Sequence, residues 1–223
     1  MGEEQHERRE KPEGEVNGKV AALNTDDRRA DQPDQADCDR REQRLSQEPI
    51  ISDLPSPFVL AWLDPVSRLV GGSAAAIDVA MGSGRHAYLL ARSGFRTFGV
   101  DIRLDAVRKA AARARAEGLV VRAWCGDLTQ VPLPRERFDV VVVTRFLERD
   151  LFASIRTTLK SGGILLYETF TVAQRRLGFG PTSPQHLLEP GELLRRLEGF
   201  EVLMYEETES PEAVARIVAR RPR

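Results

Sequence analysis

The sequence predicts an α/β fold in which helices cover both faces of a mostly parallel, doubly wound sheet. From about residue 74 onwards, short apolar runs alternate with segments of helical periodicity. Such runs are typical of strands that are buried on both faces. Glycine or acidic residues follow three successive runs, so polar groups gather at the carboxyl edge of the sheet, where open α/β sheets bind ligands.

Each element is expected from its own pattern. The predicted strands are 74–80, 97–102, 120–125, 138–144, 164–167, 201–205 and 213–219, and the predicted helices are 54–63, 85–92, 104–117, 147–159 and 190–197. An acidic turn separates the last two strands, which favours an antiparallel hairpin. Phe58 and Trp62 are spaced as on one face of a helix. They would either cover the core or form a lid over a ligand. Segment 174–189 is predicted to be a long, mobile or functional loop.

Length and composition predict one folded domain. The 223 residues are 41% apolar and 30% charged, which supports a single core over residues 48–223. Residues 1–47 contain no aromatic residue and dense mixed charge, so we expect a disordered tail. A net charge of -1 gives no nucleic-acid footprint. No signal peptide or membrane span is evident, which predicts a cytoplasmic protein without a membrane partner.

Cysteine and histidine predict no metal site. The two cysteines, Cys38 and Cys125, are too few for a disulfide framework or a metal cluster. We expect Cys125, at a strand end, to be a small buried apolar residue. The three histidines are too scattered along the chain to indicate metal ligation by spacing.

A glycine turn links the first strand to the next helix. The sequence Asp78-Val-Ala-Met-Gly-Ser-Gly84 places two glycines where the chain leaves the strand. Glycine allows a tight turn and a close ligand, and the free N–H groups of the next helix point at whatever binds. Glycines after a strand are also common turn residues, so this motif alone is compatible with a structural role.

Two further strands end in acidic residues. Asp101 ends the second strand about twenty residues after the glycines, the position from which a carboxylate binds ribose hydroxyls in dinucleotide-binding folds. Asp127 follows the third strand. Either residue alone is compatible with a helix cap or a turn. Together with the glycine turn, they favour a nucleotide-like ligand.

With these motifs the chain resembles the class I S-adenosylmethionine-dependent methyltransferases over roughly residues 53–220. The motifs that carry the resemblance are the glycine turn, Asp101, Gly126-Asp-Leu128, Phe138-Asp-Val-Val-Val-Val-Thr144 and Leu159-Lys-Ser-Gly-Gly-Ile-Leu-Leu166. The resemblance implies a Rossmann-like, mostly parallel seven-stranded sheet with a C-terminal antiparallel hairpin. Gly84-Arg-His86 and Pro190-Gly-Glu-Leu193 are similar to the tellurite-resistance type within that superfamily.

The resemblance implies S-adenosylmethionine as the cofactor. Asp78 and the loop 80–84 would hold its methionine part, Asp101 its ribose, and Asp127 with the Leu128 amide its adenine edge. The implied cofactor-binding residues are Asp78, Ala80, Gly82, Gly84, Asp101, Asp127, Leu128 and Thr144. The family most often has glycine at position 80. Because the extra methyl of Ala80 is small, we expect binding to survive with the loop slightly displaced.

The sequence contains fewer recognisable motifs for the substrate side, because methyl transfer mainly requires alignment of an already activated methyl group. The candidate substrate residues are Arg145, Glu168, Arg175 and Arg176. Arginines at a strand end or on the loop can bind an anionic substrate, or they are solvated or paired with nearby acids. Glu168 suits either a general base or a loop cap. No residue is assigned as catalytic.

The sequence therefore predicts S-adenosylmethionine-dependent methyl transfer to a small-molecule acceptor. Two alternatives stay open. Gly82-Ser-Gly-Arg-His-Ala87 fits the looser G-x-G-x-x-A form, which an NAD-binding oxidoreductase would also show. Ala80 is compatible with a non-catalytic cofactor-binding module. The acceptor atom and the oligomeric state are not predicted.

Overall fold

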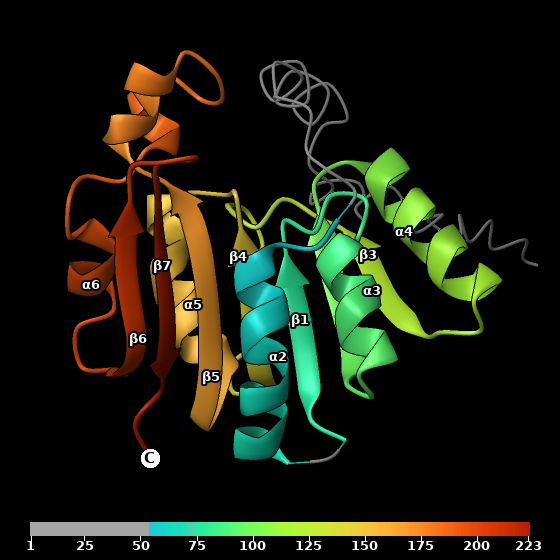
Figure 1. Ribbon diagram of the computed structural model, residues 1–223. Helices are drawn as coiled ribbons and strands as arrows, with labels where there is room; N and C mark the ends of the chain where they lie inside the picture. Colours follow the sequence, from blue (N-terminus) through green and yellow to red (C-terminus); the bar gives the residue numbers. More distant parts are fainter. Residues whose placement is uncertain (1–53, 72) are drawn as a thin grey trace, which may run out of the picture. The chain divides into compact units, whose positions relative to one another are not determined.

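The computed structural model describes residues 54–71 and 73–223, so the predicted tail 1–47 lies outside the described residues. Seven strands form one sheet in the order β3-β2-β1-β4-β5-β7-β6 (Figure 1). Strands β1 to β5 pair in parallel, whereas β7 runs antiparallel to both β5 and β6. The predicted mostly parallel sheet with a C-terminal antiparallel hairpin is confirmed.

The strands are β1 (Ala75–Val79), β2 (Arg96–Asp101), β3 (Val121–Cys125), β4 (Phe138–Thr144), β5 (Leu159–Phe170), β6 (Glu201–Thr208) and β7 (Val214–Arg220). The helices are α2 (Pro57–Val70), α3 (Arg85–Arg92), α4 (Leu104–Ala116), α5 (Phe152–Thr158) and α6 (Glu192–Arg196), with short 3-10 helices η1 (Arg149–Leu151), η2 (Val172–Leu177) and η3 (Pro184–His186). None of the helices in this described part is long and apolar enough to cross a membrane.

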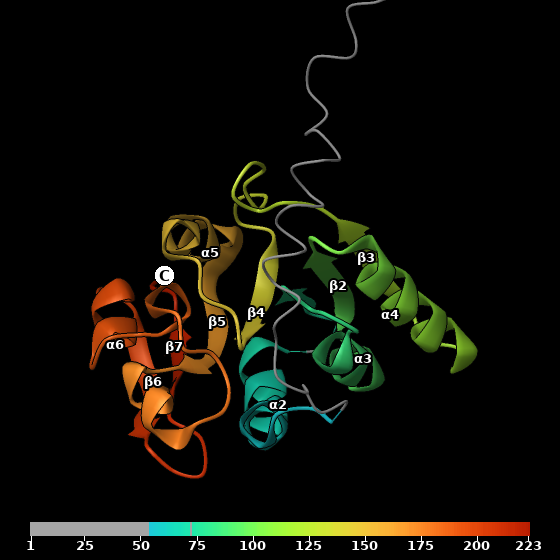
Figure 2. The ribbon, with the colours of Figure 1, turned by 90° about the horizontal axis from the view of Figure 1, so that it is seen from above.

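Helices cover both faces of the sheet, as Figure 2 shows from above. Alternate residues of β1 and β4 point to opposite faces and join two apolar clusters, one beneath α5 and α6 and one beneath α2 and α3. Continuous apolar strands suit this environment because neither face meets water. Phe58 and Trp62 of α2 pack into the second cluster, which confirms the core-cover interpretation.

The predicted helix 147–159 and the strand expected from Ile164 need correction. Helical structure ends at Thr158, and β5 begins at Leu159, which already pairs with Phe138 of β4. The glycines at 162 and 163 lie within this strand. A Cβ at Gly163 would lie only 2.9 Å from the carbonyl oxygen of Lys160, so a local irregularity in the strand explains the glycine there.

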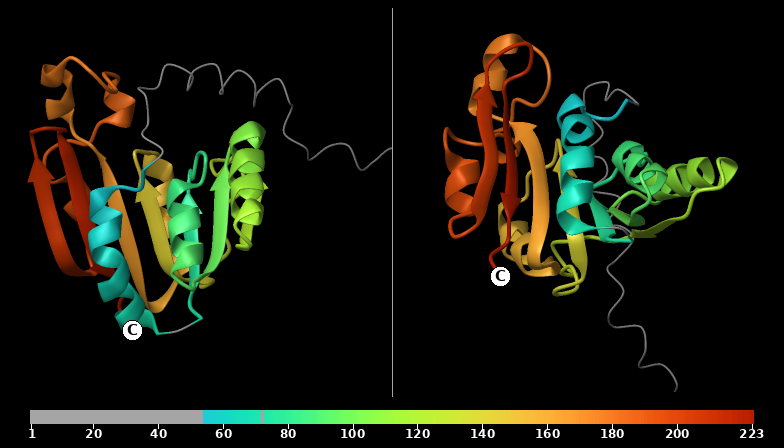
Figure 3. Two further views of the ribbon diagram at one scale, coloured as in Figure 1. Left: turned by 45° about the vertical axis from the view of Figure 1, so that its right-hand side comes forward. Right: turned by 60° about the horizontal axis from the view of Figure 1, so that its bottom comes forward.

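Two other expectations also differ from the structure. Cys125, expected to be buried, is exposed because β3 is the edge strand of the sheet. Segment 174–189 carries short 3-10 helices where the sequence predicted a long, mobile or functional loop. A bridge joins Thr171, just before this segment, to Leu188 near its end, and Figure 3 shows the segment at the carboxyl edge of the parallel strands.

Candidate functional site

The loop between β1 and α3 turns sharply at the carboxyl edge. Ala80, Gly82 and Gly84 have left-handed backbone conformations, with φ of 54°, 54° and 79°. Packing also requires glycine at 84, since a Cβ there would lie 2.6 Å from the Cβ of Ala110 in α4. At Gly82, a Cβ would meet no atom of the described residues within 4 Å. The loop is therefore closed against α4 and leaves space at Gly82 for a ligand.

Asp78 lies behind this loop. Its side chain is buried, and Oδ2 accepts a hydrogen bond from the Ala87 amide of α3 at 2.9 Å. Burial raises the pKa of Asp78 to about 7, against the lowering effects of that hydrogen bond and of Arg85. The carboxyl group thus fixes the start of α3 relative to β1. Its effect on a ligand would be indirect, because it holds the loop 80–84 in position from behind.

Asp101 joins the loop to the end of β2. Its Oδ2 accepts a hydrogen bond from the Gly82 amide at 2.7 Å, and its Oδ1 accepts one from the Arg103 amide at 2.9 Å. A carboxylate offers about four acceptor positions, so two remain for a pair of ribose hydroxyls. These two free acceptor positions and the space at Gly82 fit the ribose end of S-adenosylmethionine.

The connection after β3 lies next to Asp101. The Gly126 amide donates to the Asp101 carbonyl at 3.0 Å, which brings the two strand ends together. Asp127 Oδ1 accepts hydrogen bonds from the amide and hydroxyl of Thr129 at 2.9 and 2.7 Å, and Leu128 packs against the core. The connection that carries Asp127 and Leu128 therefore begins beside Asp101.

His86 and Thr144 form a buried pair at the ends of α3 and β4. The Ser56 amide donates to His86 Nε2 at 3.0 Å, so the ring proton resides on Nδ1, which lies 3.2 Å from Thr144 Oγ1. Burial and the positive charges of Arg85 and Arg145 lower the pKa of His86 to about 3. The imidazole is neutral, and both of its nitrogens are engaged.

Glu168 is buried at the carboxyl end of β5 with a partner on each oxygen. Oε1 accepts a hydrogen bond from the Ser56 hydroxyl at 2.8 Å, and Oε2 accepts one from Arg216 Nε at 2.5 Å. Arg216 stands directly opposite in β7 and also binds Glu206 of β6. These contacts favour a role for Glu168 in fixing the start of α2 and the β5–β7 pair over a role as general base.

The three arginines predicted for the substrate side lie in different places. Arg145 follows β4 and pairs with Glu212 at 2.7 Å. On the segment above the edge, Arg175 Nε donates to the Thr182 carbonyl at 2.9 Å. Arg176 is largely exposed and lies 3.6 Å from Glu209. Of the three, Arg145 alone reaches the ends of the parallel strands.

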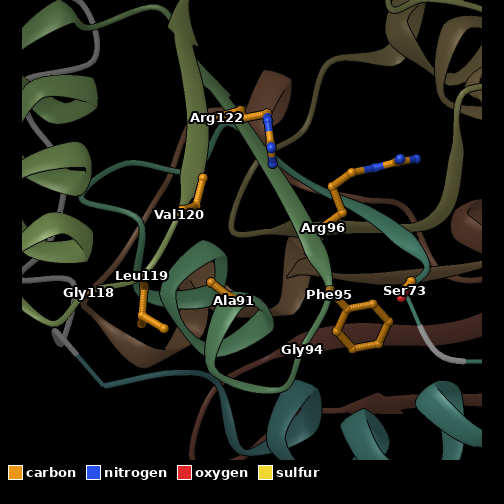
Figure 4. Close-up of a pocket in the computed structure, with 9 residues that line it drawn as sticks. All are labelled: Ser73, Ala91, Gly94, Phe95, Arg96, Gly118, Leu119, Val120 and Arg122. Atoms are coloured by element: carbon orange, nitrogen blue, oxygen red, sulfur yellow. The ribbon is translucent and has the colours of Figure 1, made fainter.

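The opposite edge of the sheet carries a hollow of about 420 Å³ (Figure 4). Arg96 and Arg122 border it near the amino ends of β2 and β3. Ligands of open α/β sheets bind at the carboxyl ends of the strands, so this hollow is not the candidate site. In the described part of the chain, no group of three or more His, Cys, Asp or Glu residues could hold a metal ion.

Sequence reasoning missed the residues that depend on distant parts of the chain. Ser56, His86, Glu212 and Arg216 were not predicted as site residues. Arg216 alone left a signal, since it interrupts an otherwise apolar strand, Val-Ala-Arg-Ile-Val-Ala. Such a charge implies a partner on a neighbouring strand.

A comparison with known protein families supports the resemblance seen in the sequence. Residues 76–163, from β1 into β5, match the family described as a methyltransferase domain. Over these residues the chain is similar to a methyltransferase domain, in agreement with the expected class I S-adenosylmethionine-dependent methyltransferase. S-adenosylmethionine is the cofactor that this similarity implies, and the open positions at Asp101 and Gly82 fit it. The match gives no support to the NAD-dependent alternative.

Solved structures of the same fold include TehB and a TehB-like methyltransferase. A TehB-like methyltransferase from Corynebacterium glutamicum is 17% identical, with a TM-score of 0.56 over 84% of this chain and 99% of its own. TehB from Haemophilus influenzae is 16% identical, with a TM-score of 0.61 over 72% of this chain and 62% of its own. A methyltransferase from Mesorhizobium loti is 18% identical, with a TM-score of 0.59 over 74% and 99%. These identities show the fold alone, and no curated protein matches the chain.

Proposed function

We propose that the enzyme transfers the methyl group of S-adenosylmethionine to a small-molecule acceptor bound beside the ends of β4, β5 and β7. The observation that carries this proposal is the division of the carboxyl edge into two polar groups. One group, around Asp101 and Gly82, lies over β1 and β2. The other, around Arg145 and Glu168, lies over β4, β5 and β7. Direct transfer requires two ligands side by side, and this edge offers a place for each.

We assign the cofactor's ribose to Asp101 and its adenine to Asp127 and Leu128. Thr144, at the end of β4, would then lie between the cofactor and the acceptor. The loop 80–84 would hold the methionine part, with Asp78 supporting it from behind. Each assignment follows from the strand end on which the residue lies.

The acceptor side favours a compact substrate. The segment Thr171–Leu188 rises from the end of β5 and walls this side (Figure 1). Gln174 anchors it, because its Oε1 accepts a hydrogen bond from the Ala213 amide at 2.8 Å and its Nε2 donates to the Phe179 carbonyl at 2.9 Å. A wall of this kind suits a small molecule better than a polymer, and a net charge of -1 gives no attraction to nucleic acid. A cytoplasmic location and the lack of a membrane partner belong to the same proposal.

When bound, S-adenosylmethionine supplies a methyl group already activated by the sulfonium charge. The protein then has to align the acceptor with this methyl group and to keep water away. Holding the two reactants in the right geometry lowers the barrier to transfer. His86 and Glu168, the buried titratable groups nearest the acceptor side, have partners on both polar atoms. They hold the walls of the site in place and are not positioned to take a proton from the acceptor.

Calorimetry tests the cofactor part of the proposal. The full-length protein should bind S-adenosylmethionine and S-adenosylhomocysteine, and it should not bind NAD. Formation of S-adenosylhomocysteine should then follow addition of a small-molecule panel and not of bulk tRNA or denatured protein. Turnover confined to the polymers would contradict the small-molecule acceptor, and binding of NAD in preference to the sulfonium cofactor would contradict the methyl transfer itself.

A further inference from the structure

Arg145 holds a conformation that few residues adopt. It directly follows β4, its φ is +53°, and its amide donates to the Glu168 carbonyl at 2.8 Å. A side chain in this left-handed region is strained relative to glycine. The guanidinium lies 5.0 Å from the centre of the Phe170 ring. The backbone and the ring together hold the guanidinium at the acceptor side of the carboxyl edge.

The hydrogen bonds of this guanidinium are incomplete. Both oxygens of Glu212 bind the same nitrogen, Nη2, at 2.9 and 2.7 Å. Nε is buried and has no hydrogen-bond partner among the described residues. A carboxylate that matches an arginine fork binds two of its nitrogens in parallel. Glu212 therefore leaves half of the fork unused, although a buried donor without a partner is costly.

A second arginine, Arg85, adds to the positive electrostatic potential around the Arg145 guanidinium. Arg85 lies at the start of α3. Burial lowers its pKa, and the positive charge of Arg145 lowers it further. The carboxyl groups of Asp78, Glu168 and Glu212 act in the opposite direction. Another negative group at the fork would relieve the repulsion between the two arginines.

We propose that Arg145 binds a carboxylate of the methyl acceptor, and that Glu212 occupies the guanidinium while the acceptor is absent. This inference rests on the proposed methyl transfer and names its substrate class. Glu212 lies in the connection between β6 and β7, and its side chain is 31% exposed. It can therefore turn into solvent when the acceptor displaces it from Arg145. The acceptor's carboxylate then bonds to Nε and Nη2 in parallel.

The test uses acetate and benzoate as probes, each compared with its amide, on full-length protein saturated with S-adenosylhomocysteine. The variant Glu212→Gln removes the internal carboxylate with little change of shape. It should bind benzoate at least tenfold more tightly than benzamide, and acetate more tightly than acetamide. The wild type should show a smaller preference of the same sign, because Glu212 competes. Adding Arg145→Gln to the variant should abolish the preference.

A matched control removes one acidic charge elsewhere. Glu201 binds Arg220 at 3.0 Å at the other end of the β6–β7 hairpin, so Glu201→Gln should behave as the wild type does. If Glu212→Gln fails to fold, Glu212→Asp takes its place, because its shorter carboxylate does not reach the same position on Arg145 and should also increase the preference for carboxylates.

The outcomes separate the possible failures. Equal affinity for acid and amide in the position-212 variant overturns the inference. A preference for acids that is present without S-adenosylhomocysteine and absent with it would assign Arg145 to the cofactor's own carboxylate, which also overturns it. If the wild type does not bind S-adenosylmethionine, the proposed function itself fails. Binding of S-adenosylmethionine without any preference for acids leaves the proposed function standing and refutes this inference alone.

Discussion

Replacing Asp101 by alanine should weaken S-adenosylmethionine binding by a factor of about 10 to 150. The two acceptor positions left on its carboxylate would each take a ribose hydroxyl, and hydrogen bonds to a charged acceptor stabilise a complex by about 1.5 to 3 kcal/mol in total. At 1.4 kcal/mol per tenfold change, this gives the stated range. Calorimetric titration of S-adenosylmethionine into wild type and Asp101→Ala measures the difference directly.

The same substitution should lower the free energy of unfolding. It removes the internal hydrogen bonds to the amides of Gly82 and Arg103, each contributing about 0.5 to 1.5 kcal/mol net, so we expect a loss of about 1 to 3 kcal/mol in urea unfolding. Asp105→Ala is the matched control, since that side chain is 61% exposed in the first turn of α4 and should leave both quantities nearly unchanged. A folded Asp101→Ala protein with the affinity of the wild type would show that the ribose binds elsewhere.

Three further substitutions test the loop and its support. Ala80→Gly should raise the free energy of unfolding by about 1 kcal/mol in urea unfolding, because φ is +54° and an L side chain is strained there; a loss of stability would contradict this. Gly84→Ala should destabilise by 2 kcal/mol or more, on the order of an overpacked core, since its Cβ would meet Ala110 at 2.6 Å; a melting temperature equal to that of the wild type would refute the close packing. Asp78 has a folded pKa of about 7, above its usual 3.8, so its contribution to stability is full below pH 4 and is lost as the pH rises to 7. The free energy of unfolding of the wild type, relative to Asp78→Asn, should therefore fall by up to about 4 kcal/mol over that range, and a constant difference from pH 4 to 8 would disprove the raised pKa.

Local patterns predicted where the loop 80–84 and Asp101 lie in the fold. The order of a buried strand, a glycine turn and a helix placed the loop 80–84 at the carboxyl edge, and the strand ends predicted that Asp101 and Asp127 would lie near it. These residues are close in sequence to the elements that position them. The hydrogen bond between Asp101 and Gly82 spans only 19 residues.

The acceptor side could not be predicted in the same way, because its contacts join distant parts of the chain. Arg145 and Glu212 are 67 residues apart, and Glu168 and Arg216 are 48 apart. Whether an arginine at a strand end is available to a ligand depends on such partners, which a local pattern does not specify. The error at Cys125 has a similar origin, since the sequence indicates a strand but not that this strand lies at the edge of the sheet.

The reversed direction of β7 has a practical consequence for experiments on this enzyme. The strand leads the chain away from the carboxyl edge, and Arg221 hydrogen-bonds to Gly162 and Gly163 beside the amino end of β5. Residue 223 therefore lies at the opposite edge of the sheet from the site (Figure 1). An affinity tag, a fluorophore or a surface linkage attached there leaves both proposed ligand positions accessible, so immobilised protein is suitable for the binding measurements described above.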